Sequence, residues 1–243
     1  MSDSNIVDIW LIDLACQRHA IAKHTLILCQ TERERAARFC FERDQRRFIV
    51  ARSALRQILG LYTGLPPGDI AFSYGPNGKP DLYGYPKEGR VRFSLSHSSE
   101  LALLAVSRAQ SVGIDIELIR PDLIIDGLAE HFFSAREVSA LRALPLSDRS
   151  HAFFSCWTRK EAYIKAFGWG LAVPLDSFTV AFGPGDPPSI LSAADPTEAS
   201  RWSMYDLNIS SEYKAALVVE GRNHRLRVRD WDENAGHAST LPS

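Results

Sequence analysis

The sequence lacks an excess of charge of either sign. Over 243 residues, 28 Lys and Arg face 29 Asp and Glu, a formal net charge of −1. A protein that holds nucleic acid or an anionic membrane through its overall field needs a basic surplus, so we expect neither partner. No apolar run approaches the ~18 residues of a membrane span. The first residues, MSDSNIVDIW, show no basic stretch before an apolar core, so no signal peptide is predicted.

Cysteine is also scarce, and several well-known motifs are missing. The four cysteines, Cys16, Cys29, Cys40 and Cys156, form no C-x-x-C pair, which argues against a zinc site. Reduced thiols in a cytoplasmic protein are the better interpretation. The sequence contains no Walker or Rossmann phosphate loop and no G-x-S-x-G nucleophile turn. These absences exclude the commonest nucleotide-binding and hydrolase architectures.

What is present is an ordinary globular composition, with 45% hydrophobic and 23% charged residues. Apolar patterns predict strands at 7–14, 70–74, 91–95, 101–106, 112–117, 178–182, 202–207 and 213–219. Helices are predicted to start at the capping boxes Thr31/Glu34 and Ser134/Glu137, and to span 44–59 before Gly60 and 148–167 before Gly168.

The order of these elements is similar in the two halves of the chain. The Gly-Pro pair at 75–76 recurs at 183–184, which is 108 residues later. The Ser-Ser-Glu at 98–100 recurs at 210–212. Such short matches arise either from a duplicated α/β unit or by coincidence, and the sequence leaves both open. In a duplicated unit, a site at the seam would draw on both halves.

The alternating segment Gly113-Ile114-Asp115-Ile116-Glu117 is the first candidate for chemistry. Residues two apart on a strand share a face, so Asp115 and Glu117 point the same way and the isoleucines point into the core. Two neighbouring carboxylates suit Mg²⁺, which prefers hard oxygen ligands. The alternative is a solvated face of an edge strand.

The second candidate is the helical segment 157–165, in which Glu161 and Lys165 are four residues apart and share a face with Trp157. Glu161 would be a third carboxylate for the same ion, and Lys165 a charge partner for phosphate. The alternative is a surface ion pair beside a core aromatic residue.

Candidate phosphate contacts come from the first half. Arginines gather at positions 33, 35, 38, 43, 46, 47, 52 and 56, either as an anion-binding surface or as a solvated helix. Lys79 stands in the turn Gly78-Lys79-Pro80, and Ser96 and His97 follow a strand. His97 is interpreted either as a phosphate donor or as a hydrogen-bonded surface residue.

Four segments in this order resemble the 4'-phosphopantetheinyl transferases of the surfactin-synthetase type: Gly78-Lys79-Pro80, FSLSHS at 93–98, VGIDIE at 112–117 and FSCWTRKEAYIK at 154–165. The run from Gly170-Leu171 to Phe178 is also similar to that family. The resemblance implies an α/β (α+β) fold, a single chain of two similar subdomains related by a pseudo-twofold axis. We place the subdomains at residues 1–109 and 110–229, followed by a flexible tail at 230–243.

The resemblance also implies the activity, in which the 4'-phosphopantetheine of coenzyme A is transferred to a serine of an apo acyl or peptidyl carrier protein and 3',5'-ADP is released. Such carriers serve fatty acid, polyketide or nonribosomal peptide synthesis. By motif position, Mg²⁺ would be held by Asp115, Glu117 and Glu161. Coenzyme A and its phosphates would be held by Arg35, Arg47, Lys79, Pro80, Ser96, His97 and Lys165. Catalysis would depend on Glu161, Lys165 and Asp115, with Glu161 as the serine's proton acceptor, in a cytoplasmic monomer.

The sequence departs from the family pattern at a few positions: Glu32 is acidic where a basic contact is expected, Trp169 stands where many relatives have Lys, and Ser94 often corresponds to Asn. Two other functions remain open. One is a different Mg²⁺-dependent phosphate enzyme, and the other is a non-catalytic nucleotide- or carrier-binding module.

Overall fold

The computed structural model describes residues 5–15, 20–75, 78–85, 90–168, 173–183, 185–193, 195, 197–232 and 239–240. The first half has a strand, three helices, a short hairpin and two long strands. In chain order these are β1 (Ile6–Asp13), α1 (Ile21–Ile27), α2 (Gln30–Ala36), α3 (Glu42–Thr63), the 3-10 helix η3 (Pro67–Asp69), β2 (Phe72–Tyr74), β3 (Pro80–Leu82), β4 (Val91–Ser98) and β5 (Leu101–Arg108).

The second half repeats this order. It has one extra short helix before its last two long strands, and two further strands follow at its end. Its elements are β6 (Val112–Leu118), α4 (Ile125–Phe132), α5 (Ala135–Ala143), α6 (Leu146–Phe167), η5 (Leu175–Ser177), β7 (Thr179–Val180), β8 (Ile190–Ser192), α7 (Glu198–Arg201), β9 (Trp202–Asp206), β10 (Tyr213–Glu220), β11 (Arg225–Asp230) and β12 (Ser239–Thr240). The strand predicted at 178–182 is reduced to β7.

The strand order is the same in both halves. The first sheet contains β1-β5-β4 and the second β6-β10-β9, all paired antiparallel, and β2-β3 corresponds to the hairpin β7-β8. The duplicated-unit hypothesis is therefore confirmed and coincidence is rejected. β11 leaves the second half and pairs parallel with β1, and β12 follows it at the edge, so part of the region assigned to the second subdomain and tail joins the first sheet.

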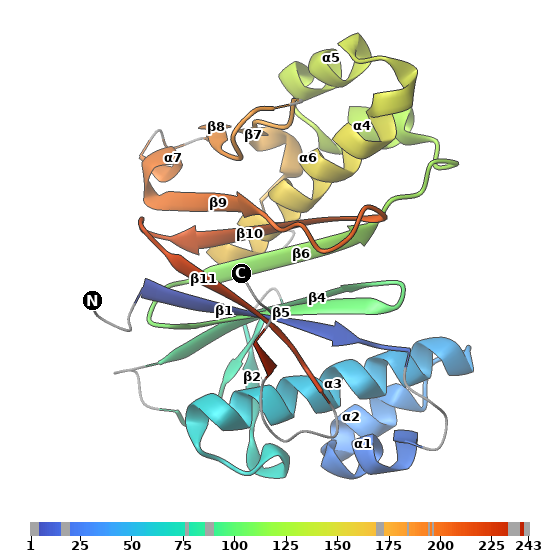
Figure 1. The fold of residues 1–243 in the computed structure, drawn as a ribbon, viewed down its shortest axis with the longest axis vertical. Helices are drawn as coiled ribbons and strands as arrows, with labels where there is room; N and C mark the ends of the chain where they lie inside the picture. The colour runs from blue at the N-terminus through green and yellow to red at the C-terminus, as the bar shows by residue number, and fades with distance from the viewer. Residues whose placement is uncertain are drawn as a thin grey trace.

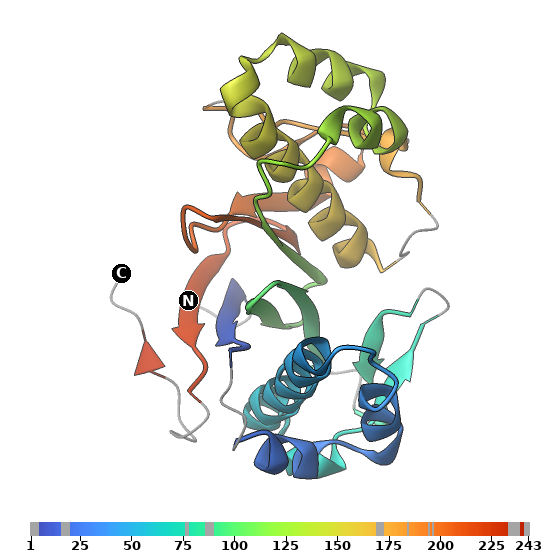
Figure 2. The same cartoon turned by 90° about the vertical axis from the view of Figure 1, so that its right-hand side faces the viewer.

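The molecule is stacked in layers. In Figure 1, α6 covers the second sheet, the first sheet lies beneath it, and α3 covers the far face; Figure 2 shows the same stacking from the side. Three large apolar clusters fill the spaces: one between α6 and the second sheet, one between α3 and the first, and one between the two sheets. Burial of this apolar surface is the main force that holds the halves together. In the described part of the chain no helix is both long and apolar enough to cross a membrane.

The two long helices, α3 and α6, each have 22 residues and end at a left-handed glycine. Gly168 has a φ of 78° and ends α6 as predicted, because a residue without Cβ adopts this conformation at little cost. The prediction that Gly60 ends α3 is wrong, since the helix continues to Gly64. A Cβ on Gly60 would lie 3.0 Å from the Leu65 carbonyl oxygen, so this glycine marks a close approach of the returning chain.

The capping box of α5 is confirmed: Ser134 Oγ accepts from the Glu137 amide, and Glu137 accepts from the Ser134 amide. The box predicted at Thr31/Glu34 is wrong, because α2 begins at Gln30 with Cys29 as its N-cap. There the carboxylate of Glu32 accepts from the Cys29 amide. Both halves thus place a capping glutamate at the same point of the second helix.

Each capping glutamate also forms a buried ion pair with the long helix. Glu32 accepts from Arg56, which donates to the carbonyls of Pro67 and Ile70 beyond α3. In the second half, Glu137 lies 2.7 Å from Lys160, which donates to the carbonyls of Leu175 and Phe178. We call these the two latches; each joins the second helix, the long helix and the loop that leaves it.

Candidate functional site

The seam between the halves is formed by β4 of the first and β6 of the second. The Ile114 amide donates to Ser94 Oγ (3.2 Å) and the Leu118 amide donates to Ser98 Oγ (3.0 Å). From the first contact to the second, the residue numbers rise by four on both strands, so β4 and β6 run in the same direction. Serine side chains thus bridge two strands that belong to different sheets.

The carboxylate face of β6 lies against α6. Ile114 and Ile116 belong to the core between the sheets, so Asp115 and Glu117 face the other way, as the alternation predicted. Helix α6 approaches β6 so closely that a Cβ on Gly113 would meet the Ala162 carbonyl oxygen at 2.0 Å. This approach brings the helix residues beside the strand carboxylates.

Lys165, on α6, donates to Asp115 Oδ1 (2.6 Å) and to Ser96 Oγ (2.9 Å), and Ser96 donates to the same carboxylate oxygen (2.7 Å). Asp115 is buried, and Lys165 is partly exposed. The alternative in which Lys165 forms only a surface pair with Glu161 is rejected, as is the solvated edge face for Asp115. Residues of β4, β6 and α6 meet at this point.

The other two acids, Glu117 and Glu161, lie close enough to Asp115 for its charge to raise their pKa values. Burial raises the pKa of Glu161, and the charges of Asp115 and Glu117 raise it further. Burial and the charge of Asp115 likewise raise the pKa of Glu117, although Ser98 donates to it at 2.7 Å. A group of mutually repelling carboxylates favours a nearby cation.

The donor chemistry of this face fits Mg²⁺. Within the described residues, the buried Asp115 Oδ2 has no hydrogen-bond partner, and the acids around it supply only hard oxygen atoms. In that same set of residues, no three His, Cys, Asp or Glu side chains are arranged so that they could hold a metal ion. In this structure the charge of Asp115 is instead compensated by Lys165.

A pocket of about 370 Å³ opens at the seam beside this face. Its lining includes six residues expected at the site or beside it: Arg35, Lys79, Pro80, His97, Glu161 and Lys165. Lys79 reaches across from the first half, and its Nζ donates to the carbonyls of Val112 (3.1 Å) and Lys165. Burial, assisted by the Arg92 charge, lowers the pKa of Lys79 to about 8.

His97 lines this pocket and its side chain is exposed, so both interpretations, as a phosphate donor and as a surface residue, stay open. Partial burial and the positive charges of Lys165 and Arg47 lower the pKa of its imidazole. Arg35 stacks over the ring of Phe48, 5.2 Å from its centre. Arg47 pairs with Glu100 and Asp44 and does not line the pocket.

The arginine cluster is only partly available for a ligand. Arg52 and Arg56 both donate to Glu32, so the unexpected acid at position 32 pairs with two buried guanidinium groups. Arg43 pairs with Asp44 at the surface. The cluster is therefore partly a buried network and partly a solvated surface, and the pocket draws on Arg35 and Arg52.

Sequence reasoning missed several residues that build the site. Ser94 and Ser98 join β4 to β6, and Gly113 permits the approach of α6. The alternating serines of the 93–98 segment were a visible signal for a strand with one polar face. Trp157 packs in the core against Phe132 and Phe153, so it is not a site residue. Cys16, Trp169, Gly170 and Leu171 lie outside the described residues.

Comparison with known proteins gives two adjacent family matches. Residues 111–218 match the 4'-phosphopantetheinyl transferase superfamily, and residues 15–109 match the 4'-phosphopantetheinyl transferase N-terminal family.

Two bacterial relatives and one solved structure illustrate the likeness. The 4'-phosphopantetheinyl transferase HetI of Nostoc sp. is 38% identical over 218 residues, which cover 90% of this chain and 89% of that protein. The 4'-phosphopantetheinyl transferase Sfp of Bacillus subtilis is 35% identical over 61% of this chain and 64% of its own. The holo-[acyl-carrier-protein] synthase of Thermotoga maritima aligns with a TM-score of 0.38 and 19% identity, over 46% of this chain and 64% of that one. The chain thus belongs to the 4'-phosphopantetheinyl transferase family, of the surfactin-synthetase type.

Proposed function

We propose that this enzyme transfers the 4'-phosphopantetheine group of coenzyme A to a serine hydroxyl of an apo carrier protein, with Mg²⁺ at the seam and 3',5'-ADP as the other product. The meeting of Asp115, Lys165 and Ser96 beside a pocket that reaches into both halves supports this best. Phosphoryl transfer requires mainly positioning and neutralisation of charge, and this face offers acids and cations together.

Mg²⁺ would be held by Asp115, Glu117 and Glu161, where it would neutralise diphosphate charge and polarise the attacked phosphorus. The other parts of the reaction fall to the chain itself. Glu161 lines the pocket, and its carboxylate would accept the serine proton. Lys165 would turn from Asp115 toward the transferring phosphate.

The first half would hold the nucleotide end. Arg35, Lys79, Pro80 and His97 line the pocket beside Lys165, with Ser96 behind it, and Arg47 contributes positive charge from the rim. His97 faces this pocket, and its imidazole would donate a hydrogen bond to a phosphate oxygen. Action as a cytoplasmic monomer remains a prediction.

The test is the mass of several apo carrier proteins after incubation with the enzyme, coenzyme A and Mg²⁺. We expect a gain of one phosphopantetheine on the carrier serine and release of 3',5'-ADP. Carriers that stay unmodified while phosphate or nucleotide is released would favour a different phosphate enzyme. Coenzyme A binding by calorimetry without turnover would favour a binding module. Either result would overturn the proposal.

A further inference from the structure

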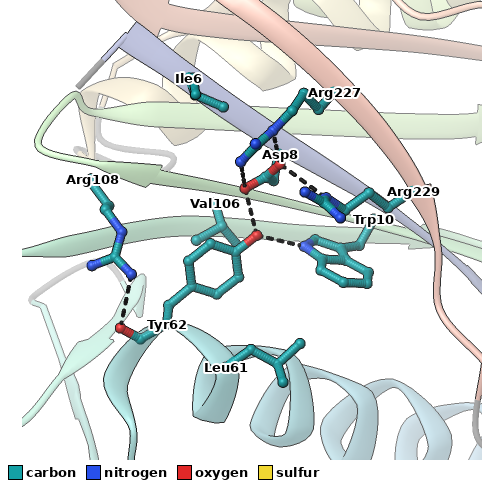
Figure 3. A pocket seen from close by; sticks show the side chains of 9 residues that line it. All are labelled: Ile6, Asp8, Trp10, Leu61, Tyr62, Val106, Arg108, Arg227 and Arg229. Carbon is teal, nitrogen blue, oxygen red and sulfur yellow. Dashed lines mark hydrogen bonds and ion pairs between the residues drawn. The ribbon is translucent and has the colours of Figure 1, made fainter. Parts of the chain in front are cut away.

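A second pocket, of about 300 Å³, lies in the first half between the end of α3 and β1. Figure 3 shows its lining residues around Asp8. Asp8 accepts from Arg227 Nε (2.7 Å) and Nη2 (2.9 Å), from Arg229 Nε (3.1 Å) and from Tyr62 Oη (2.7 Å). The pocket is separate from the seam, and its residues play no part in the proposed transfer.

The pseudo-twofold symmetry makes this pocket the counterpart of the seam. In the ladder between β1 and β5, Asp8 pairs with Val106 and Trp10 pairs with Leu104. In the ladder between β6 and β10, Gly113 pairs with Val218 and Asp115 pairs with Ala216. Matching these ladders puts Asp8 at the place of Gly113, and Trp10 at the place of Asp115. The equal lengths of α3 and α6 put Leu61 at the place of Lys165 and Tyr62 at that of Ala166.

The neighbouring strands correspond in the same way. At the seam, β4 runs beside β6 in the same direction, and in the first half β11 runs parallel beside β1. In place of the serines of β4, β11 presents Arg227 opposite Asp8 and Arg229 opposite Trp10. The carboxylate face has thus been replaced by guanidinium groups around a single acid.

The pocket is open because the long helix is held away from the sheet. Gly113 lets α6 touch β6, whereas the first half has Asp8 on the strand and Tyr62 on the helix, joined by a hydrogen bond. Trp10 donates to the same Tyr62 hydroxyl at 2.9 Å, which fixes the pocket wall. The space is therefore a consequence of large side chains at both positions.

The charge of the pocket favours an anion. Three guanidinium groups, of Arg108, Arg227 and Arg229, line the pocket together with the Asp8 carboxylate. Arg108 donates to the Tyr62 carbonyl at the end of α3 and so offsets the negative end of that helix. Guanidinium groups bind phosphate oxygens in pairs and remain charged at every physiological pH.

We propose that this pocket is a second, metal-free binding site for a phosphate group, either free phosphate or the phosphate of a small ester. The carboxylate in its lining, that of Asp8, already accepts hydrogen bonds from Arg227, Arg229 and Tyr62, so a ligand would be held by arginines alone. This proposal does not depend on the activity at the seam.

The experiment follows the indole N–H of Trp10, in the pocket wall, by ¹⁵N–¹H NMR of the full chain; the Trp10→Phe variant assigns the signal. Inorganic phosphate, diphosphate and methyl phosphate are titrated at constant ionic strength set with NaCl. We expect a saturating shift that Arg229→Gln and Arg108→Gln each weaken about tenfold, as expected for loss of a charged hydrogen bond. Arg136→Gln, which removes the same charge from the exposed side of α5, is the matched control and should leave the affinity unchanged.

Tighter binding of methyl phosphate than of inorganic phosphate would identify the ligand as an ester, and the reverse order would identify it as free phosphate. Because Arg229 also anchors β11, the spectrum of each variant is compared with that of the wild type. Arg108→Gln decides the outcome if Arg229→Gln disturbs the fold. Absence of a saturating shift, or equal weakening by Arg136→Gln, would overturn the proposal.

Discussion

The two halves have one architecture but different chemistry. Both contain three antiparallel strands in the same order, a 22-residue helix that ends at a left-handed glycine, and a buried latch built on a capping glutamate. At matched positions the second half has Asp115 and Glu161, whereas the first has Trp10 and Gln57. The two halves thus share a scaffold, and acidic side chains at a few positions distinguish the half that we propose to be catalytic.

The largest expected effect tests that difference in acids. Glu161→Gln should lower the rate of carrier modification by about 10²–10⁴-fold, because the proton acceptor and a cation ligand are lost together. Gln57→Ala, at the matched position of α3, should change the rate less than about twofold. Equal losses in the two variants, measured by carrier mass against time, would show that the halves do not differ in this way.

The next effect tests what the halves share. Glu32→Gln and Glu137→Gln should each reduce the free energy of unfolding by about 3–5 kcal/mol, because each leaves a buried cation unpaired. The control is Glu130→Gln, which breaks the exposed pair with Arg142 and should cost less than about 1 kcal/mol. Urea unfolding gives these values. A latch variant as stable as the control would refute the role given to that latch.

A smaller effect tests why α6 touches β6 while α3 stands off β1. Gly113→Ala should reduce the free energy of unfolding by about 3 kcal/mol, because its Cβ would collide with the backbone of Ala162 and Ala166. Gly127→Ala, within α4, has open space around its Cβ and should stabilise the chain by about 1 kcal/mol. Denaturation of both variants by urea measures the contrast; a Gly113→Ala variant of wild-type stability would contradict the close approach.

The smallest effect is a pH dependence in the first half. Burial alone would raise the pKa of Asp8, but hydrogen bonds from Arg227, Tyr62 and Arg229 outweigh it and lower this pKa below 3.8. A carboxyl with a lowered folded-state pKa stabilises the protein above its unfolded-state pKa, and this contribution is lost as the pH falls through the folded-state value. The stability gap between wild type and Asp8→Asn should therefore be constant above about pH 5 and shrink below pH 4. Thermal unfolding at several pH values measures it, and a gap independent of pH would contradict the assignment.

Local patterns predicted much of this structure. The alternation on β6 placed Asp115 and Glu117 on one face, the spacing of Glu161 and Lys165 placed both on the pocket side of α6, and Gly168 ended that helix. These features depend on residues within one or two turns of each other, so they are visible in a short stretch of sequence.

Features that depend on distant partners were not predictable in this way. Glu32 was noted only as an odd acid, because its partners Arg52 and Arg56 lie on another helix. Local spacing predicts a helix end at Gly60, whereas this glycine accommodates the returning chain at Leu65. The stretch 225–230 alternates Arg with apolar residues, yet nothing local indicates pairing with a strand 219 residues away.

The acids of β6 and α6, Asp115, Glu117 and Glu161, would together hold one divalent cation at the seam. Electron paramagnetic resonance of added Mn²⁺, a probe for such oxygen sites, tests it directly in the wild type and in Asp115→Asn, Glu117→Gln and Glu161→Gln. We predict that each substitution weakens Mn²⁺ binding at least about tenfold. Wild-type affinity in Glu161→Gln would contradict the claim, because the helix acid would then contribute nothing to the site.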